Sequence, residues 1–405
     1  MILAYKYRIY PGRKQKKRIR STFKTCRNLY NEMLALGIDS YKNGNVTLDR
    51  RDYYSYAKGY SDKVYSQVLQ NFGDRLSKSF KNFFRRIKNK SCEKKGYPRF
   101  KSRVKSIIYP QSGFKFLSNK TIHVSKLGNM PIKLHRIPRG KMKTMSIKEN
   151  QAGQFFIYFT CEVEKEMQCN KSNESSIGID VGIKNFAVLS NGETIGNPRF
   201  LVRSENKLKK LQIKLSRKRK GSMNRRKAKL RLAKQHIKIA NQRNDFLHKL
   251  SSNIASKYSL IKAESLNIKG MVKNHHLAKH INDASWNSFM QMLSYKAVKC
   301  GGQLIKVVSR NTTKTCSNCG NIQEMPLSKR TFKCINCGFT CDRDLNAAIN
   351  ISNKKQANYQ PKISHYHGRA GLARTYTPEE TSANTSSKLL ASTVNEPGTT
   401  CGSQE

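Results

Sequence analysis

Hydrophobic residues recur with two different periods in the first hundred residues. Residues 2–10 mix apolar and basic positions as a half-exposed strand does, and Pro11-Gly12 ends that strand. The next segment predicts a helix, because its apolar residues fall on one face of a 3.6-residue period: Ile19, Phe23, Cys26, Tyr30 and Met33. Another helix is expected within 62–90, and a turn-rich junction follows at 96–103. We therefore predict one strand leading into a helical module, 13–103, with basic faces.

Short apolar runs replace the helical period between residues 106 and 163. Gly, Pro and Asn separate these runs, which is typical of short strands joined by turns. The predicted strands are 107–109, 122–124, 132–134, 145–147 and 155–159. Together with the first strand they predict a small β-barrel or sandwich over 1–12 and 104–170. Its aromatic and basic side chains are either core or contacts for bases and phosphates.

Strands and helices alternate in the second half of the chain. A polar linker, 164–176, precedes an apolar strand at 177–182 and a second strand at 186–189 that turns back antiparallel. Two long helices within 201–258 predict a hairpin. Strands at 260–266 and 304–308 flank a helix that opens at Trp286, and we expect its apolar stripe to pack on the sheet.

Three acidic residues are placed on separate predicted elements of this region. Asp180 lies within an apolar strand, where a carboxylate is costly to bury without a cation or a donor. Glu264 lies near the end of a later strand, and Asp344 lies in the first turn of a helix. Three such carboxylates are what two Mg²⁺ ions need for phosphodiester hydrolysis, one ion activating water and the other stabilising the leaving oxygen. Each acid alone also fits an ordinary strand or helix start.

Two cysteine pairs lie between the last strand and the last helix. Cys316 and Cys319 form one Cys-x2-Cys pair, Cys334 and Cys337 form the other, and 14 residues separate the pairs. A glycine follows each pair and permits the tight turn that lets both thiolates reach one ion. This spacing predicts a closed, structural Zn²⁺ site over 312–340. Cys341 breaks the pairing and is interpreted as a spare thiol.

The net charge adds a class of partner. The 405 residues hold 79 Lys and Arg against 25 Asp and Glu, a formal charge of +54, and residues 201–250 alone hold 18 Lys and Arg against 2 acids. So large a surplus favours a polyanionic partner. A nucleic-acid duplex of about 20 base pairs would supply on the order of 40 phosphates. A solvated basic surface and a ribosomal-type protein are alternatives that composition leaves open.

The chain shows no run of about 18 apolar residues and no apolar leader, so we expect a cytoplasmic, nucleoid-associated protein without membrane contact. Its eleven cysteines fit a zinc set plus reduced thiols better than disulfides. Residues 353–405 are rich in Ser, Thr, Asn and Pro, lack periodicity and are predicted to be disordered.

The ordered motifs together resemble one family. IGIDVGIKNFAVLSNG, ESLNIKGMVKN, SWNSFMQMLSYKA, TCSNCG, CINCG and DRDLNAAINI follow one another between residues 177 and 351. In this order they resemble the TnpB family of insertion-sequence proteins, RNA-guided nucleases related to type V CRISPR effectors. The N-terminal segments YKYRIYPGRKQ and GYPRFKSR match more loosely.

The resemblance implies a multidomain α+β protein. It implies a wedge-type barrel (1–12 and 104–170) with an inserted helical recognition module (13–103). It also implies a RuvC-like, RNase H-like nuclease domain (171–311 and 341–352) that contains the basic hairpin 201–258 and the zinc-binding insertion 312–340. Asp180, Glu264 and Asp344 match the catalytic acids that hold Mg²⁺, and the four paired cysteines match the zinc ligands. Asp344 is preferred to Asp342, which becomes a neighbouring surface acid or supports the site indirectly.

The resemblance further implies a guide RNA derived from the element end and a double-stranded DNA target bearing a short flanking motif. We therefore expect an RNA-guided, Mg²⁺-dependent DNA endonuclease, acting as a monomeric ribonucleoprotein. A nuclease-inactive guide-directed DNA-binding regulator and a transposase or accessory factor in transposition are the alternatives. The order Asp, Glu, Asp differs from the Asp, Asp, Glu of cut-and-paste transposases, which argues against strand transfer.

Overall fold

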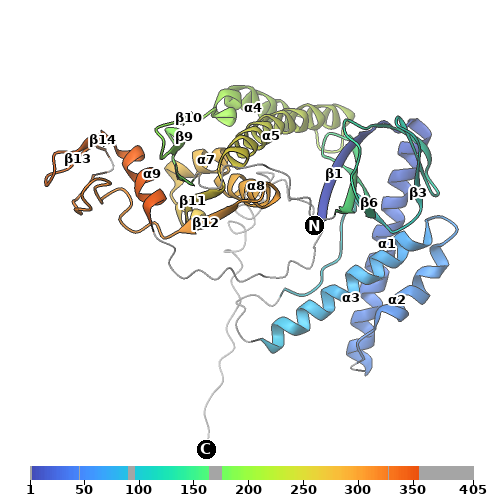
Figure 1. Ribbon diagram of the computed structural model, residues 1–405. Helices are drawn as coiled ribbons and strands as arrows, with labels where there is room; N and C mark the ends of the chain where they lie inside the picture. Colours follow the sequence, from blue (N-terminus) through green and yellow to red (C-terminus); the bar gives the residue numbers. More distant parts are fainter. Residues whose placement is uncertain (1, 45, 90–95, 164–175, 327, 355–405) are drawn as a thin grey trace, which may run out of the picture. The chain divides into compact units, whose positions relative to one another are not determined.

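The computed structural model describes residues 2–44, 46–89, 96–163, 176–326 and 328–354 (Figure 1). Most of the predicted linker 164–176, and the predicted disordered tail from residue 355 onward, lie outside these residues. Separate hydrophobic cores form in the N-terminal part and in the part after residue 176. Each part is described by itself below.

A seven-stranded antiparallel sheet forms the N-terminal part. Its strands are β1 (Ile2–Ile9), β2 (Ser106–Pro110), β3 (Phe114–Ser118), β4 (Thr121–Val124), β5 (Gly128–Lys133), β6 (Lys141–Glu149) and β7 (Phe155–Glu162). The order is β2-β6-β7-β1-β5-β4-β3, so the first strand of the chain lies in the middle of the sheet. All the strands predicted for this region are present, and β3 is an additional strand. Phe114 and Phe116 alternate with Lys115 in β3, and this short pattern is the signal that could have located the strand.

This sheet curls back on itself. Phe159 on β7 lies 5.8 Å from Phe114 and 5.2 Å from Phe116, ring centre to ring centre, although three strands separate β7 from β3 in the sheet. The side chains that close the inside include Tyr7, Ile9, Ile147 and Ile157, all of them buried. The curled sheet agrees with the predicted barrel, but β2 and β3 remain its two edge strands.

Three helices are inserted between β1 and β2, where two were predicted. They are α1 (Arg13–Gly44), α2 (Arg50–Ala57) and α3 (Ser66–Lys88), with the 3-10 turn η1 (Lys58–Tyr60) before α3. The five apolar residues predicted to share a face of the first helix are all buried. Helix α2 was not predicted, although Asp49 caps it in a capping box with Asp52. That pair is the signal that could have located it.

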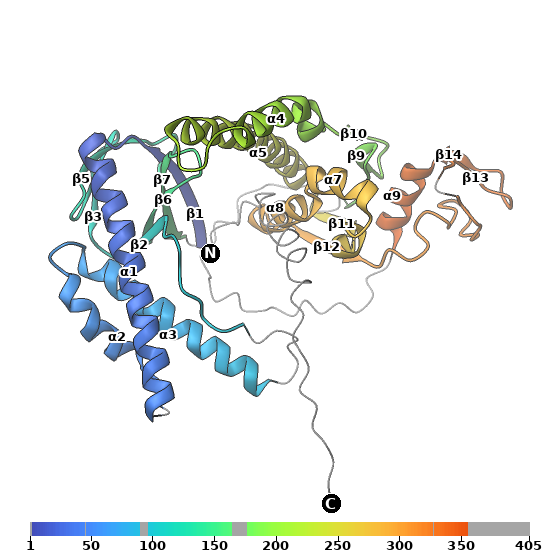
Figure 2. The same ribbon diagram turned by 180° about the vertical axis from the view of Figure 1, so that it is seen from behind.

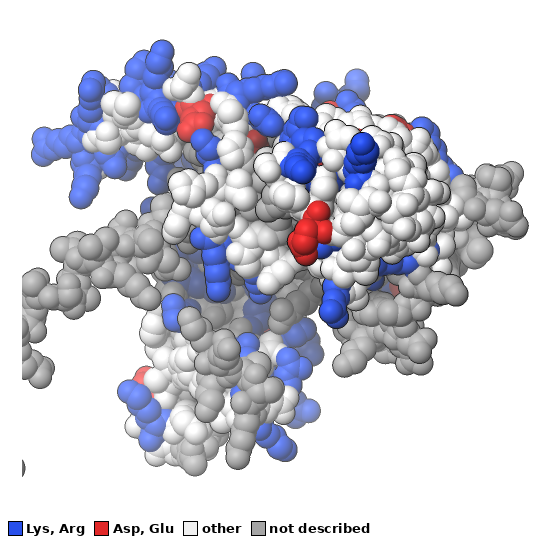
Figure 3. All heavy atoms as spheres, turned by 90° about the vertical axis from the view of Figure 1, so that its left-hand side faces the viewer, with Lys and Arg blue, Asp and Glu red and all other residues white. Residues whose placement is uncertain are grey.

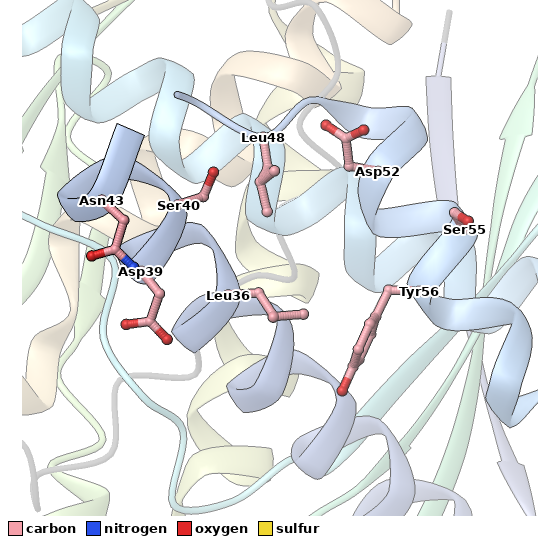
Figure 4. Close-up of a pocket in the computed structure, with 8 residues that line it drawn as sticks. All are labelled: Leu36, Asp39, Ser40, Asn43, Leu48, Asp52, Ser55 and Tyr56. Carbon is pink, nitrogen blue, oxygen red and sulfur yellow. The ribbon is translucent and has the colours of Figure 1, made fainter. Parts of the chain in front are cut away.

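An open hollow of about 580 Å³ lies between the end of α1 and α2 (Figure 4). Its lining includes the carboxyl groups of Asp39 and Asp52 and no Lys, Arg, His or Cys. A hollow with this charge does not attract phosphate groups, so we assign it no part in binding nucleic acid.

A five-stranded mixed sheet organises the part after residue 176. Its strands are β8 (Ser176–Val181), β9 (Asn185–Leu189), β10 (Thr194–Gly196), β11 (Leu260–Glu264) and β12 (Gln303–Val307), in the order β10-β9-β8-β11-β12. β8, β11 and β12 are parallel, whereas β9 and β10 run antiparallel to their neighbours. Trp286, Phe289 and Leu293 pack in the core of this part, which confirms the predicted apolar stripe.

Helices connect and cover these strands. They are α4 (Phe200–Ser216), α5 (Met223–Lys257), α6 (Ile268–Met271), α7 (His275–Ala284), α8 (Trp286–Lys299) and α9 (Arg343–Asn353). α4 and α5 lie side by side as the predicted basic hairpin (Figures 1 and 2). The cysteine-rich segment before α9 carries the short strands β13 (Thr331–Lys333) and β14 (Thr340–Asp342), which pair with each other.

Candidate functional site

Asp180 and Glu264 lie on neighbouring parallel strands. The register pairs Ile179 of β8 with Ala263 of β11, so the next residues along the two strands, Asp180 and Glu264, stand at the same level. Ile179 and Ala263 are fully buried in the core on one face of the sheet. Since side chains alternate along a strand, both carboxylates point to the opposite face. The fold therefore places the first two predicted acids beside each other.

Helix α9 brings Asp344 to the same face. Gly178 lies two residues before Asp180, and a Cβ atom there would stand 2.1 Å from the carbonyl oxygen of Ala348 and 2.6 Å from the nitrogen of Ser352. Only glycine allows the helix backbone to lie this close to β8. Asp344 lies one helical turn from Ala348, and Asp180 lies two residues along the strand from Gly178. These two steps have about the same length. Asp344 therefore approaches Asp180.

Glu264 and Asp344 both act on the charge of Asp180. The pKa of Asp180 is raised to about 8, first by burial and then by the negative charges of Glu264 and Asp344, while Arg343 opposes the rise. Burial also raises the pKa of Glu264, against the hydrogen bond from Thr312 and the charge of Lys354. Acids whose charges are this poorly compensated favour binding of a cation.

Basic residues and a hydroxyl contact two of the acids. The guanidinium of Arg343 donates to Asp344 Oδ1 at 3.1 Å, and Arg330 lies 3.8 Å from Asp344 Oδ2. The hydroxyl of Thr312 donates to Glu264 Oε1. Asp342 caps α9 by accepting from the backbone of Asp344 at 2.8 Å and of Leu345 at 3.2 Å. Asp342 thus supports the helix that carries Asp344, which agrees with its predicted indirect part.

The four predicted zinc ligands come together. Their sulfur atoms all lie within 4.8 Å of one another. Among the described residues, no other group of three or more His, Cys, Asp or Glu ligand atoms is gathered that closely. The three acids are spaced more widely than this. Cys316 Sγ lies 3.8 Å from Cys337 Sγ, and Cys319 Sγ lies 3.6 Å from Cys334 Sγ. A tetrahedral ion with Zn–S bonds of about 2.3 Å requires sulfurs about 3.8 Å apart, so these residues fit Zn²⁺.

The pKa values of the paired cysteines shift in both directions, and burial raises that of Cys316 to about 11. Hydrogen bonds from the backbone of Asn321 and the side chain of Asn336 lower the pKa of Cys319 to about 6. Backbone hydrogen bonds also lower the pKa of Cys334. Cys341, the predicted spare thiol, packs beside this core, and burial raises its pKa. A thiolate binds zinc more readily than a thiol, so the two shifts to lower pKa agree with the geometry.

Two asparagines join the cysteine segment to α9. Asn346 is fully buried; it accepts from the backbone of Ser317 at 2.9 Å and donates to the carbonyl of Thr315 at 2.7 Å. Asn350, one turn later, donates to the carbonyls of Thr312 at 2.9 Å and Thr315 at 2.6 Å. The first cysteine knuckle is therefore bonded directly to the helix that carries Asp344.

The outer face of the N-terminal sheet is a second functional candidate, which the sequence indicated only as one alternative and without naming its residues. Arg8 pairs across strands with Phe156, and Lys6 pairs with Tyr158. Lys6 Nζ lies 4.5 Å and Arg8 Cζ 4.9 Å from the centre of the Phe156 ring. Burial and the nearby charges of Lys148 and Arg8 lower the pKa of Lys6, and Arg8 Nε is buried without a hydrogen-bond partner. No acid stands in these two rows of paired residues. The alternation of cations in β1 with buried Tyr5, Tyr7 and Ile9 is the signal that could have located it.

A third candidate is a polar stripe on α3. Gln67, Asn71 and Arg75 recur every four residues, so they share one face of the helix. Each has a buried side-chain atom without a hydrogen-bond partner in the structure. Buried polar groups are normally paired, so three in a row on one helix make this stripe unusual.

Basic side chains far outnumber acidic ones on the face seen in Figure 3. The predicted basic hairpin forms, and its apolar residues Leu208, Leu232 and Ile239 make a small core of their own.

None of the described helices is both long and apolar enough to cross a membrane.

Three family profiles match the chain in order. Residues 1–45 match the helix-turn-helix domain of the OrfB_IS605 family, residues 158–275 match the OrfB_IS605 family described as a probable transposase, and residues 286–351 match the Cas12f1-like TNB domain. The first name does not describe the local fold, because residues 2–44 form β1 and one long helix.

Proteins similar over most of the chain carry matching names. A protein of Streptomyces pristinaespiralis, named as a proposed RNA-guided DNA endonuclease, is 33% identical over 365 residues, covering 86% of this chain and 88% of its own. One of Escherichia coli K12 with the same description is 29% identical and covers 86% and 91%. The TnpB-like protein L79 of Acanthamoeba polyphaga mimivirus is 32% identical over 52% of this chain and 42% of its own.

A solved structure shares the fold. The Cas12f1 chain of a complex with guide RNA and target DNA matches 87% of this chain and 99% of its own, with a TM-score of 0.54 and 15% identity. At that identity the match supports the fold alone. The profiles and the relatives agree with the motif order, and the chain belongs to the TnpB family of insertion-sequence proteins.

Proposed function

We propose that this protein is an RNA-guided DNA endonuclease with a RuvC-like nuclease domain. The observation that carries the proposal is the convergence of Asp180, Glu264 and Asp344 on one face of the mixed sheet, with the pKa of Asp180 raised to about 8 by burial and by the other two acids. The full-length relatives named as RNA-guided DNA endonucleases support the same activity.

The three acids suit hard divalent cations, because their oxygens are the ligands that Mg²⁺ prefers. Bound Mg²⁺ would supply an activated water and stabilise the leaving oxygen. The charges of both other acids act on Asp180, so it would take part in holding the metal. Burial of the acids keeps the local dielectric low, which strengthens their attraction for a cation. The zinc-binding segment, through Asn346 and Asn350, holds the helix that presents Asp344.

The guide RNA is proposed to lie on the outer face of the N-terminal sheet. Lys6, Arg8 and Lys148 place positive charge there without a facing acid, and Phe156 and Tyr158 add aromatic rings. Aromatic residues on a sheet can stack on unpaired bases while cations bind the phosphates between them. Burial lowers the pKa of Lys6, and repulsion by Lys148 and Arg8 adds to the shift; a polyanion would relieve that repulsion.

The polar stripe on α3 is proposed to contact the DNA beside the target. Side chains of the Asn, Gln and Arg types recognise base edges through paired hydrogen bonds. Gln67, Asn71 and Arg75 present these types at helical spacing on one face of α3. They are the residues that we propose for reading the flanking motif.

The first test is the nucleic acid that accompanies the protein. The chain would be expressed with the DNA of its own element and purified, and the bound RNA would be sequenced. We expect a structured RNA that ends in a variable guide, and a particle that removes matched targets with one flanking motif from a random library. Bound RNA without a guide, together with no loss of any target, would contradict the proposal.

A further inference from the structure

Thr312 contacts Glu264 in a way that bears on metal binding. Its hydroxyl donates to Glu264 Oε1, and the side chain is buried, with 3% of its surface exposed. A carboxylate in this position can otherwise rotate about its last bond, since that torsion is soft. A donor on Oε1 fixes the carboxylate plane and leaves Oε2 available as the ligand.

The loop that carries Thr312 is held on several sides. Lys354 Nζ donates to the carbonyls of Val308 at 2.6 Å and Arg310 at 2.8 Å. Asn350 of α9 donates to the carbonyl of Thr312 at 2.9 Å. The second acceptor near the Thr312 hydroxyl, the carbonyl of Ser309, lies farther away at 3.3 Å. The hydroxyl is therefore held facing Glu264 by backbone that α9 itself fixes.

Thr312 thereby joins three parts of the site. It lies four residues before Cys316, its carbonyl is bonded to the helix of Asp344, and its hydroxyl is bonded to Glu264. We propose that Thr312 is a positioning residue that orients Glu264 toward its metal ion. This inference rests on the proposed nuclease function. It predicts a defect in metal affinity rather than in folding when the hydroxyl is removed.

The test compares four forms of the complete ribonucleoprotein: wild type, Thr312→Val, Thr312→Ser and the neighbouring control Thr313→Val. Two quantities are measured, the Mg²⁺ concentration for half-maximal cleavage and the binding of Mn²⁺, followed by the electron paramagnetic resonance of the free ion. Thr312→Val removes the donor and keeps the shape, Thr312→Ser restores the donor, and Thr313→Val makes the same chemical change one residue away. Thermal unfolding of each form reports on folding.

Thr312→Val should raise the half-maximal Mg²⁺ concentration and weaken Mn²⁺ binding about tenfold, the effect of one hydrogen bond to a charged group. Cleavage at saturating Mg²⁺ should change by less than about threefold. Thr312→Ser and Thr313→Val should behave as wild type. If Thr312→Val does not fold, Thr312→Ala carries the same prediction.

Two results would overturn the inference. One is a folded Thr312→Val protein with wild-type Mg²⁺ dependence and Mn²⁺ binding. The other is equal loss of cleavage at every Mg²⁺ concentration, which would indicate a purely structural part for Thr312. A wild-type particle that binds Mn²⁺ but cuts no matched DNA would instead contradict the proposed function, and the Mn²⁺ comparison would still decide the part that Thr312 plays.

Discussion

Gly178 on β8 and Ala348 on α9 lie so close that a Cβ atom on the glycine would stand 2.1 Å from the carbonyl oxygen of the alanine. The contact is between two backbones, which cannot rotate away as a side chain can. It fixes how far α9 stands from the sheet, and therefore where Asp344 lies relative to Asp180. Gly178, the first glycine of the IGIDVG motif, thus helps to shape the candidate metal centre.

Gly178→Ala should destabilise the protein by about 1–3 kcal/mol and abolish cleavage, because α9 must move away from β8. Gly196→Ala is the matched control, since a Cβ atom there meets nothing within 4 Å and its backbone needs no positive φ. Thermal unfolding and guided cleavage measure both effects. A Gly178→Ala protein with wild-type cleavage would show that the close packing does not set the position of Asp344.

Removing the charge of Asp180 should stabilise the Mg²⁺-free protein at pH 8. The folded pKa of about 8 lies above the ordinary value of 3.8, so the folded state binds more protons and loses stability as pH rises from about 4 to 8. Asp180→Asn lacks this loss. We expect it to be more stable than wild type at pH 8, by about 2 kcal/mol or more, and to gain less at pH 5. Equal stability of the two proteins at both values would contradict the burial of a charged Asp180.

Cys334→Ser should lower the zinc content and the cleavage activity together. The closed cysteine site contributes to folding, and Asn346 transmits its position to α9. Cys341→Ser is the control, because that thiol lies outside the four-sulfur cluster. Zinc per chain is measured by elemental analysis beside guided cleavage. Full cleavage by Cys334→Ser would separate the zinc site from the placement of Asp344.

Arg8→Ala and Phe156→Ala should each weaken guide RNA binding. Loss of a base-stacking ring costs about 1–3 kcal/mol of binding free energy. Loss of a phosphate contact lowers the slope of log affinity against log salt concentration by about one. Lys143→Ala provides the control, since that ammonium pairs with Glu162 at 2.6 Å, toward the other end of strand β6 from Lys148. Filter binding at several salt concentrations measures both quantities. Unchanged affinity and salt slope in Arg8→Ala would remove this face from the RNA site.

The parts of the fold that depend on local pattern could be predicted from the sequence. The cysteine spacing predicted four ligands that the structure brings together, and the apolar period of 13–44 predicted its buried face. The three acids were identified one element at a time, and the strand register then placed Asp180 beside Glu264. Each of these predictions needed only residues close in sequence, together with the ordered motifs that the family shares.

The remaining features depend on contacts between residues far apart in the chain. Thr312 and Glu264 are 48 residues apart, and neither sequence context shows that one hydroxyl faces the other. The closeness of Gly178 to α9 likewise appears only when helix and strand are packed. The strand order of the curled sheet, with β1 at its centre, is decided by tertiary packing and has no local signal.

The most direct measurement is cleavage of DNA by the purified ribonucleoprotein, with the wild-type protein and Asp180→Ala compared in Mg²⁺. The account predicts that the wild type cuts a plasmid that carries the matched target and flanking motif, and spares one with a scrambled target. It predicts that Asp180→Ala binds the same target without cutting it, because the guide and the DNA-contacting surfaces are intact. A wild-type particle that binds the matched target but cuts it no more than Asp180→Ala does would contradict the nuclease assignment.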